Sequence, residues 1–113
     1  MSPDELTGLP DRGEILARLE SSLSLASQHH QPLAILYIDT DRLLSVNSTY
    51  GHLAGDAYIH HVAGVLSELL PPHAAAGRVA GDEFLLVATG ASAAEALALA
   101  ETVRSEVEAR PLS

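Results

Sequence analysis

Two short acidic clusters hold the side chains of this 113-residue chain whose types and spacing could do chemistry. Asp39-Thr40-Asp41 directly follows an apolar run, 33–38, and Asp82-Glu83 lies between two further apolar runs. Carboxylates at the end of a strand and at the tip of a hairpin can converge on one hard cation. Mg²⁺ takes a few carboxylate oxygens and leaves its other positions to water and phosphate. The two clusters therefore predict a divalent-cation site that handles nucleoside triphosphates.

A simpler interpretation of the same carboxylates stays open from the residues alone. Asp39 and Asp41 could cap a helix, and Asp82 could fill a turn, because acidic residues do both routinely. Neither role needs a cation.

Three predicted strands would position these clusters. The run 33–38 is almost unbrokenly apolar, which predicts a strand that is buried on both faces. Residues 78–87 predict two short strands around a tight turn, with both carboxylates of the second cluster at its tip. Glu83 would then follow Asp82 on the opposite face of the pleat.

The first predicted helix precedes these strands. Asp11 followed by Glu14 has the spacing of a capping box, with Asp in place of the usual Ser or Thr. The helix should fray in the polar run 27–32. Its inward face is predicted from helical spacing to consist of Ile15, Leu19, Leu23 and Ala26.

Three more helices are predicted after the first strand. A short one covers about 41–50, and a longer one covers about 54–70, where Pro71-Pro72 stops it. Ser92 and Glu95 form a second capping box, which starts the last helix. The inward residues of the two longer helices are predicted as Ile59, Val62, Ala63, Leu66, Leu69, Leu99, Val103 and Val107. The predicted order is α-β-α-α-β-β-α, in one α/β domain.

Five motifs follow one another in an order that resembles a known family. They are the segment 4–12 (DELTGLPDR), the turn 38–41 (IDTD), Asn47, Gly51-His52 with Gly55-Asp56, and AGDEF at 80–84. Together they resemble the GGDEF domain, the catalytic module of diguanylate cyclases, over nearly the whole chain. The resemblance implies a ferredoxin-like fold of the nucleotide-cyclase type, related to polymerase palms, and condensation of two GTP into cyclic di-GMP and pyrophosphate. It also implies one domain over 4–113, after a leader at 1–3, without the family's C-terminal strands and helix.

The resemblance assigns roles to the acidic clusters. Asp39 and the Thr40 carbonyl match the family's metal ligands, for Mg²⁺ or Mn²⁺. Asp82 matches the other metal carboxylate and is a candidate to accept the proton of the attacking 3′-hydroxyl. Glu83 is expected to give a supporting contact. Cations that bridge triphosphate oxygens sharpen a nucleophile and neutralise a leaving pyrophosphate.

Asn47 and Asp56 match the family's guanine-binding residues. A carboxylate accepts from guanine N1–H and N2–H, and an amide can donate to O6 or N7. In the alternative interpretation, Asn47 is solvated and Asp56 sits near a helix N-terminus, where negative charge is favourable anyway. His52, Asp56 and His60 could also share a helix face and bind Zn²⁺, but two glycines, Gly51 and Gly55, weaken the premise that a helix begins there.

Two departures from the family pattern bear on activity. Leu43-Leu44 stands where the family has Phe-Lys, and that Lys is implied to neutralise phosphate in the transition state. Losing such a contact typically costs about two to three orders of magnitude in rate. Ala80 replaces the first glycine of GGDEF, which is tolerated where the backbone stays in an ordinary region. We therefore expect a weak or inactive cyclase; the alternative is a degenerate domain that binds guanine nucleotide or acts as a dimerising regulatory module.

The amino-acid composition limits the kinds of partner and site that the chain can have. The net charge of −9, with no lysine and scattered arginines, argues against nucleic-acid binding, since such proteins neutralise phosphates with clustered Lys and Arg. The chain has no cysteine, which excludes disulfides and thiolate metal sites. No membrane span or signal peptide is predicted, so the cytoplasm is the expected location. GTP is the expected substrate. A homodimer is implied by the resemblance, and an open edge of the strand 33–38 predicts strand pairing or domain swapping.

Overall fold

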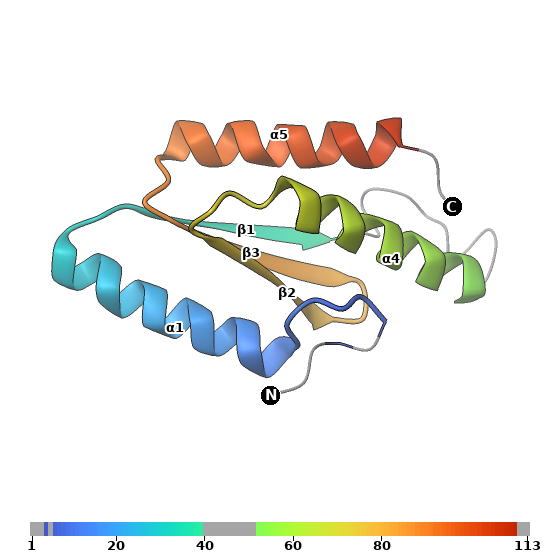
Figure 1. Cartoon of the computed structure of the whole chain (residues 1–113), viewed down its shortest axis with the longest axis horizontal. Coiled ribbons are helices and arrows are strands. Elements are labelled where there is room, and N and C mark those ends of the chain that lie inside the picture. The colour runs from blue at the N-terminus through green and yellow to red at the C-terminus, as the bar shows by residue number, and fades with distance from the viewer. Residues whose placement is uncertain (1–3, 5, 40–51, 111–113) are drawn as a thin grey trace.

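The structure of the protein, a computed structural model, describes residues 4, 6–39 and 52–110 (Figure 1). The predicted short helix over 41–50 lies outside the described residues. The elements, in chain order, are α1 (Arg12–His29), β1 (Leu33–Asp39), α4 (His52–Leu69), β2 (Ala74–Ala80), β3 (Glu83–Thr89) and α5 (Ala93–Ala109). The predicted order of the described helices and strands is confirmed.

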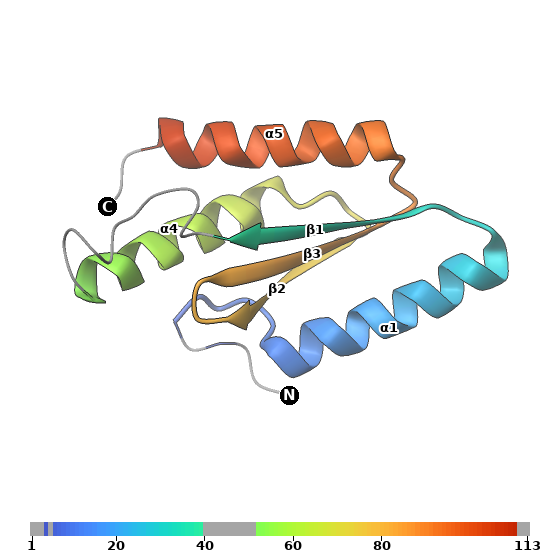
Figure 2. The ribbon, with the colours of Figure 1, turned by 180° about the vertical axis from the view of Figure 1, so that it is seen from behind.

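The three strands form one antiparallel sheet in the order β1-β3-β2 (Figures 1 and 2). The hairpin of β2 and β3 therefore lies beside β1, as predicted, and β3 is the central strand. α1 covers one face of the sheet and α4 and α5 cover the other. No helix of the described residues combines the length and the apolar character that a bilayer crossing needs.

Successive side chains of each strand point to opposite faces of the sheet, so the hydrophobic core has two parts. One cluster lies under α4 and α5, and its largest fully buried side chains are Val62, Val65, Leu66, Phe84 and Leu86. A smaller cluster under α1 consists of Ile15, Val79, Leu85 and Val87. Most inward predictions are confirmed, but Leu23 is wrong: its side chain is 50% exposed. Ser22 and Ala26, in the same half of α1, are buried instead, so the inward face of the helix passes beside Leu23.

The prediction that the first strand is buried on both faces is also wrong. Ile35 is 45% exposed and Tyr37 is 61% exposed. Both lie on the α1 face of β1, and α1 packs mainly across β2 with much less contact to β1, so these two side chains stay exposed. Among the described residues β1 has a hydrogen-bonded neighbour on one side only.

The helix termini follow from local sequence. Asp11 caps α1 by accepting from the Glu14 amide at 2.9 Å, but Glu14 does not complete the box. α1 continues to His29, beyond the predicted fray, because His30 turns left-handed (φ 53°) and its amide bonds back to the Ala26 carbonyl. The capping box of α5 is complete in both directions, as predicted, at 2.9 and 3.1 Å.

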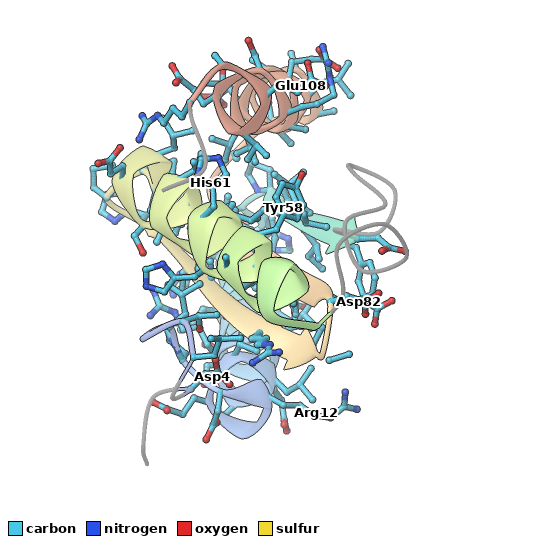
Figure 3. All side chains as sticks on the ribbon, turned by 90° about the vertical axis from the view of Figure 1, so that its right-hand side faces the viewer. Asp4, Arg12, Tyr58, His61, Asp82 and Glu108 are labelled. Carbon is cyan, nitrogen blue, oxygen red and sulfur yellow. The ribbon has the colours of Figure 1, made fainter. Side chains whose placement is uncertain are left out.

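α4 and α5 are held together at one end by polar contacts as well as by the core. The His61 Nε2 atom lies 3.1 Å from the carbonyl of Val107, which is in the last turn of α5 (Figure 3). Arg110 forms an ion pair with Glu68. The His61 contact gives the Val107 carbonyl a partner that the end of its own helix cannot supply.

Candidate active site

The strand register brings the two acidic clusters together. Asp39, the last residue of β1, lies directly opposite Glu83, the first residue of β3. Directly opposed residues share a face of the sheet, with Cβ atoms about 4.5–5.5 Å apart. Asp82 precedes Glu83 in the turn, at the end of the sheet (Figure 3). Asp39, Asp82 and Glu83 are all partly buried. Glu83 thus lies on the same face of the sheet as Asp39, so it is closer to the other carboxylates than the predicted position on the opposite face of the pleat suggested.

A tyrosine that the sequence analysis did not single out borders this cluster. Tyr37 is two residues before Asp39, on the same face of β1. The pKa of Tyr37 is raised, chiefly by a hydrogen bond that its hydroxyl donates to Glu83, and further by burial and by the charges of Glu83, Asp39 and Asp82. The sequence did contain a signal for this role. Tyr37 has a hydroxyl group, it is two residues before Asp39 and so shares its face of the strand, and the other residues of 33–38 are aliphatic.

The chemistry of these donors fits a divalent cation. Like charges directly opposite one another destabilise a sheet, and a cation between them would offset this. The pKa of Tyr37 is raised chiefly by its hydrogen bond to Glu83, and the charges of Glu83, Asp39 and Asp82 raise this pKa further. No group of three or more His, Asp or Glu among the described residues could by itself hold a metal. Mg²⁺ does not need one, since it is usually held by one or two carboxylates together with substrate phosphates and water.

The turn between β2 and β3 contains only Gly81 and Asp82, and it follows an irregularity. The register shifts between Arg78 and Ala80, so Val79 is an extra residue in β2. Ala80 lies outside the left-handed region, which explains how it can replace a glycine. A Cβ added at Gly81 would have no described atom within 4 Å. Packing against the described residues therefore does not require glycine there.

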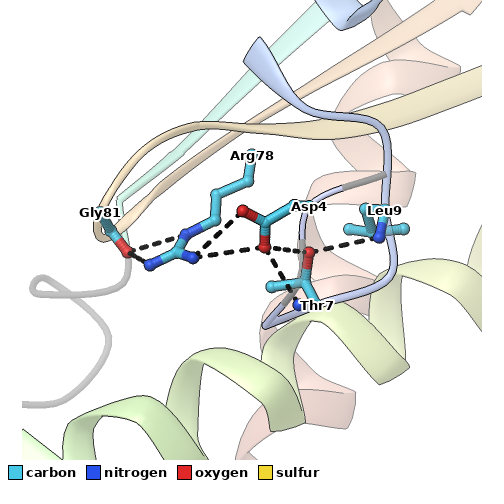
Figure 4. A network of polar contacts seen from close by, with 5 residues as sticks. All are labelled: Asp4, Thr7, Leu9, Arg78 and Gly81. Atoms are coloured by element: carbon cyan, nitrogen blue, oxygen red, sulfur yellow. Dashed lines mark hydrogen bonds and ion pairs between the residues drawn. The ribbon is translucent and has the colours of Figure 1, made fainter. Parts of the chain in front are cut away.

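Two arginine side chains donate hydrogen bonds to backbone carbonyls in and beside this turn, and Figure 4 shows one of them, Arg78. Arg78 donates to the Gly81 carbonyl from Nε at 3.2 Å and from Nη2 at 2.7 Å. Its Nη1 atom donates to both oxygens of Asp4, at 3.2 and 3.3 Å. Arg12 donates to the carbonyl of Val79 at 3.0 Å. Asp4, Arg12 and Arg78 all belong to motifs that the sequence analysis quoted, but their mutual contacts were not predicted.

Asp4 is itself held in a tight local network. Its Oδ2 atom accepts from the Thr7 amide at 3.0 Å and from the Thr7 hydroxyl at 2.8 Å. Burial raises the pKa of Asp4, but the bonds from Thr7 and the charge of Arg78 outweigh it and hold the pKa below its ordinary value. Asp4 is therefore ionised at neutral pH.

The remaining predicted site residues are only partly placed. Thr40 and Asn47 lie outside the described residues, and so does the side chain of Asp56, the fifth residue of α4. A pocket of about 360 Å³ runs from Asp39 along β1 to α5. Its lining is mostly apolar: Ile35, Leu36, Tyr37, Ile38, Asp39, Ala100, Val103 and Arg104.

Comparison with known proteins identifies the family. The family model described as "Diguanylate cyclase, GGDEF domain" matches residues 1–113. Diguanylate cyclase TpbB of Pseudomonas aeruginosa (strain UCBPP-PA14) is 38% identical over 107 residues, which cover 94% of this chain and 25% of that protein. The chain thus spans about a quarter of this curated relative.

Solved structures agree with this. The GGDEF domain of DgcB from Caulobacter crescentus, in complex with c-di-GMP, is 28% identical with a TM-score of 0.90, over 99% of this chain and 66% of that chain. The GGDEF domain of TpbB from P. aeruginosa (PAO1) is 35% identical with a TM-score of 0.85, over 95% and 63%. The predicted fold is confirmed, and the chain belongs to the GGDEF domain family.

Proposed function

We propose that this chain is a GTP-binding module of cyclic di-GMP signalling, of the diguanylate cyclase type, with a requirement for Mg²⁺ or Mn²⁺. The observation that supports this most is the opposition of Asp39 and Glu83 beside the Asp82 turn, in a chain of this family. The relative TpbB is named a diguanylate cyclase, which supports the same reaction class.

Each site residue has a role in this proposal. Asp39, Asp82 and the Thr40 carbonyl would hold the divalent cation, which would neutralise and orient the triphosphate. Asp82, in the turn, would accept a proton from the 3′-hydroxyl of bound GTP, and Glu83 would support it from the adjacent strand. Asn47 and Asp56 would recognise the guanine edge, and adenine would leave these polar groups unpaired.

We propose further that turnover by this chain is slow. Leu44 stands where the family pattern has a phosphate-neutralising Lys, and the chain contains no lysine that could take its place. This same observation favours a second candidate function, a degenerate GGDEF domain that binds guanine nucleotide and acts as a regulatory or dimerising module.

A second copy of the chain is the proposed partner. Cyclisation of two GTP molecules needs two sites that face each other, and the open edge of β1 offers a second contact through strand pairing or exchange of an element. The exposed Ile35 and Tyr37 on this strand support an association there. The proposal places the domain in the cytoplasm, where GTP is available.

Two measurements test the proposal. We expect calorimetry to show weak GTP binding that requires Mg²⁺, because the phosphates have few basic side chains to contact. Incubation with GTP and Mg²⁺ or Mn²⁺, followed by chromatography, should yield cyclic di-GMP slowly. GTP binding without formation of cyclic di-GMP would favour the second candidate function, the degenerate GGDEF domain. Tight GTP binding in the presence of a chelator, or no binding with either cation, would overturn the site.

A further inference from the structure

We propose that Arg78 is a positioning residue that fixes the backbone of the Gly81-Asp82 turn, and that Asp4 fixes Arg78. The segment 4–9 would then set the direction of the Asp82 carboxylate. The effect on ligand binding rests on the function proposed above, whereas the effect on the turn does not.

The contact acts on the peptide plane next to Asp82. Both Nε and Nη2 of Arg78 donate to the Gly81 carbonyl, at 3.2 and 2.7 Å. This oxygen shares a rigid plane with the amide of Asp82. Holding the oxygen therefore fixes ψ of Gly81 and φ of Asp82, and with them the direction in which the Asp82 side chain leaves the backbone.

The turn needs such an external hold. Gly81 is exposed and has no side chain, and glycine is the residue with the widest backbone freedom. Its Cβ position has no described neighbour within 4 Å, so packing does not fix the residue. Asp39 and Glu83 are held by the strand ladder, but Asp82 lies beyond it. The guanidinium of Arg78 adds a direct constraint on the backbone of this turn.

The guanidinium is in turn held by a rigid acceptor. The Arg78 and Asp4 side chains are only 18% and 21% exposed, so this pair is less screened than a surface ion pair. Asp4 is fixed by the two bonds from Thr7, and its own amide donates to the Leu9 carbonyl at 2.7 Å. The path from Thr7 through Asp4 and Arg78 to the turn is thus an unbroken series of hydrogen bonds (Figure 4).

Geometry, and not only charge, is what an arginine contributes here. Its planar fork presents donors in fixed directions, so one group can bond a carboxylate on one side and a carbonyl on the other. A lysine ammonium keeps the charge but cannot reach both acceptors in this arrangement. Arg78→Lys therefore separates positioning from simple neutralisation of the acidic cluster.

The experiment uses the full chain with three substitutions: Arg78→Lys, Asp4→Asn and Arg78→Met. Arg18→Lys is the matched control, since Arg18 lines a pocket with Thr89 and Gly90 at the opposite end of β3. Amide resonances of Gly81, Asp82 and Glu83 are recorded without ligand, and the affinity for GTP with Mn²⁺ is measured for each protein.

We expect Arg78→Lys to shift these three amide resonances and to weaken the binding of GTP with Mn²⁺ by about tenfold to a hundredfold, the usual effect of losing an outer partner of a metal ligand. Arg18→Lys should change neither. Asp4→Asn should shift the same resonances in the wild-type background but not in the Arg78→Met background, because its influence runs through Arg78.

Two results would overturn the positioning role. One is turn resonances and affinity that stay unchanged in Arg78→Lys. The other is a shift of the turn resonances by Asp4→Asn that is equally large in the wild-type and Arg78→Met backgrounds. If the wild type binds no GTP with Mn²⁺, the proposed function fails while the resonances still decide the positioning. If Arg78→Met does not fold, the comparison of Asp4→Asn alone with Asp4→Asn plus Arg78→Lys replaces it.

Discussion

The carboxylate of Asp82 is chemically prominent and structurally peripheral. It lies in a two-residue turn beyond the strand ladder, so the core does not depend on it. Asp39, by contrast, ends a strand and is paired in register with Glu83. The two carboxylates should therefore respond differently to substitution, and Asp82 gives the cleaner test of function.

Asp82→Asn should weaken Mg²⁺-dependent GTP binding by about tenfold or more, since an amide is a poorer ligand of a hard cation than a carboxylate. The melting temperature of the Asp82→Asn protein should stay close to that of the wild type. Calorimetry and thermal unfolding measure the two effects, with Glu20→Gln, on the exposed surface of α1, as the charge-matched control. Unfolding without a change in binding would show that the Asp82 carboxylate is structural.

Asp4 should make stability depend on pH in the acidic range. Although burial raises its pKa, the bonds from Thr7 and the charge of Arg78 lower the pKa in the folded state, so the stabilising contribution is present above the unfolded-state pKa. It is lost as the pH falls below about 4 and through the folded-state pKa. Asp4→Asn should cost about 1–3 kcal/mol at pH 7, the range for hydrogen bonds to charged groups. Urea titrations at pH 7 and pH 3 should show this difference shrinking at pH 3, and a constant difference would contradict it.

At the scale of elements, the packing of α1 on β2 depends on one glycine. A Cβ at position 77 would lie 2.5 and 2.8 Å from Cβ and Cγ2 of Ile15, and 2.9 Å from the carbonyl oxygen of Pro10. The amide of Arg78 donates to that same Pro10 carbonyl at 3.1 Å. The start of α1 is therefore pressed against the strand that leads into the turn.

Gly77→Ala should destabilise the fold by at least about 2 kcal/mol, since the clash involves backbone and a fully buried side chain. Gly64→Ala is the control in α4, where an added Cβ meets no described atom within 4 Å. It should stabilise by about 1 kcal/mol through helix propensity alone. Urea unfolding compares the two, and equal effects would show that α1 adjusts freely over β2.

At the scale of the whole molecule, the sheet is covered unevenly. α4 and α5 cover one face, whereas α1 leaves Ile35 and Tyr37 of β1 exposed beside an edge that has no paired strand among the described residues. Exposed apolar edges are templates for pairing with another chain. The net charge of −9 opposes association at low salt, so self-association should strengthen as salt is added.

Light scattering of the 113-residue chain at high micromolar concentration should therefore give a mass above that of a monomer. Ile35→Lys should reduce this mass, because a charge on an edge strand blocks pairing. Leu97→Lys, at a 72% exposed position on α5, should leave it unchanged. A monomer with slow amide exchange along β1 would rule out association through this edge.

How far the sequence predicts the structure depends on the range of each interaction. The capping box at Ser92 and Glu95 and the stop before Pro71 were predicted because they are decided within a few residues. The exposure of Tyr37 was not predicted, since this exposure depends on where α1 lies over the sheet. The register that opposes Asp39 to Glu83, and the contact of Asp4 with Arg78, join distant parts of the chain and leave no local signal.

The pairing of β1 with β3 has a consequence for the order of folding. The β2–β3 hairpin closes over a two-residue turn, whereas β1 must reach β3 across the part of the chain that contains α4 and β2, which carries a larger entropy of loop closure. Asp82 and Glu83 would then be in place before Asp39 arrives, and late docking of β1 would complete the cation site. Local opening of β1 should dismantle the site while the hairpin persists, so ligand binding would slow hydrogen exchange along β1 more than within the hairpin.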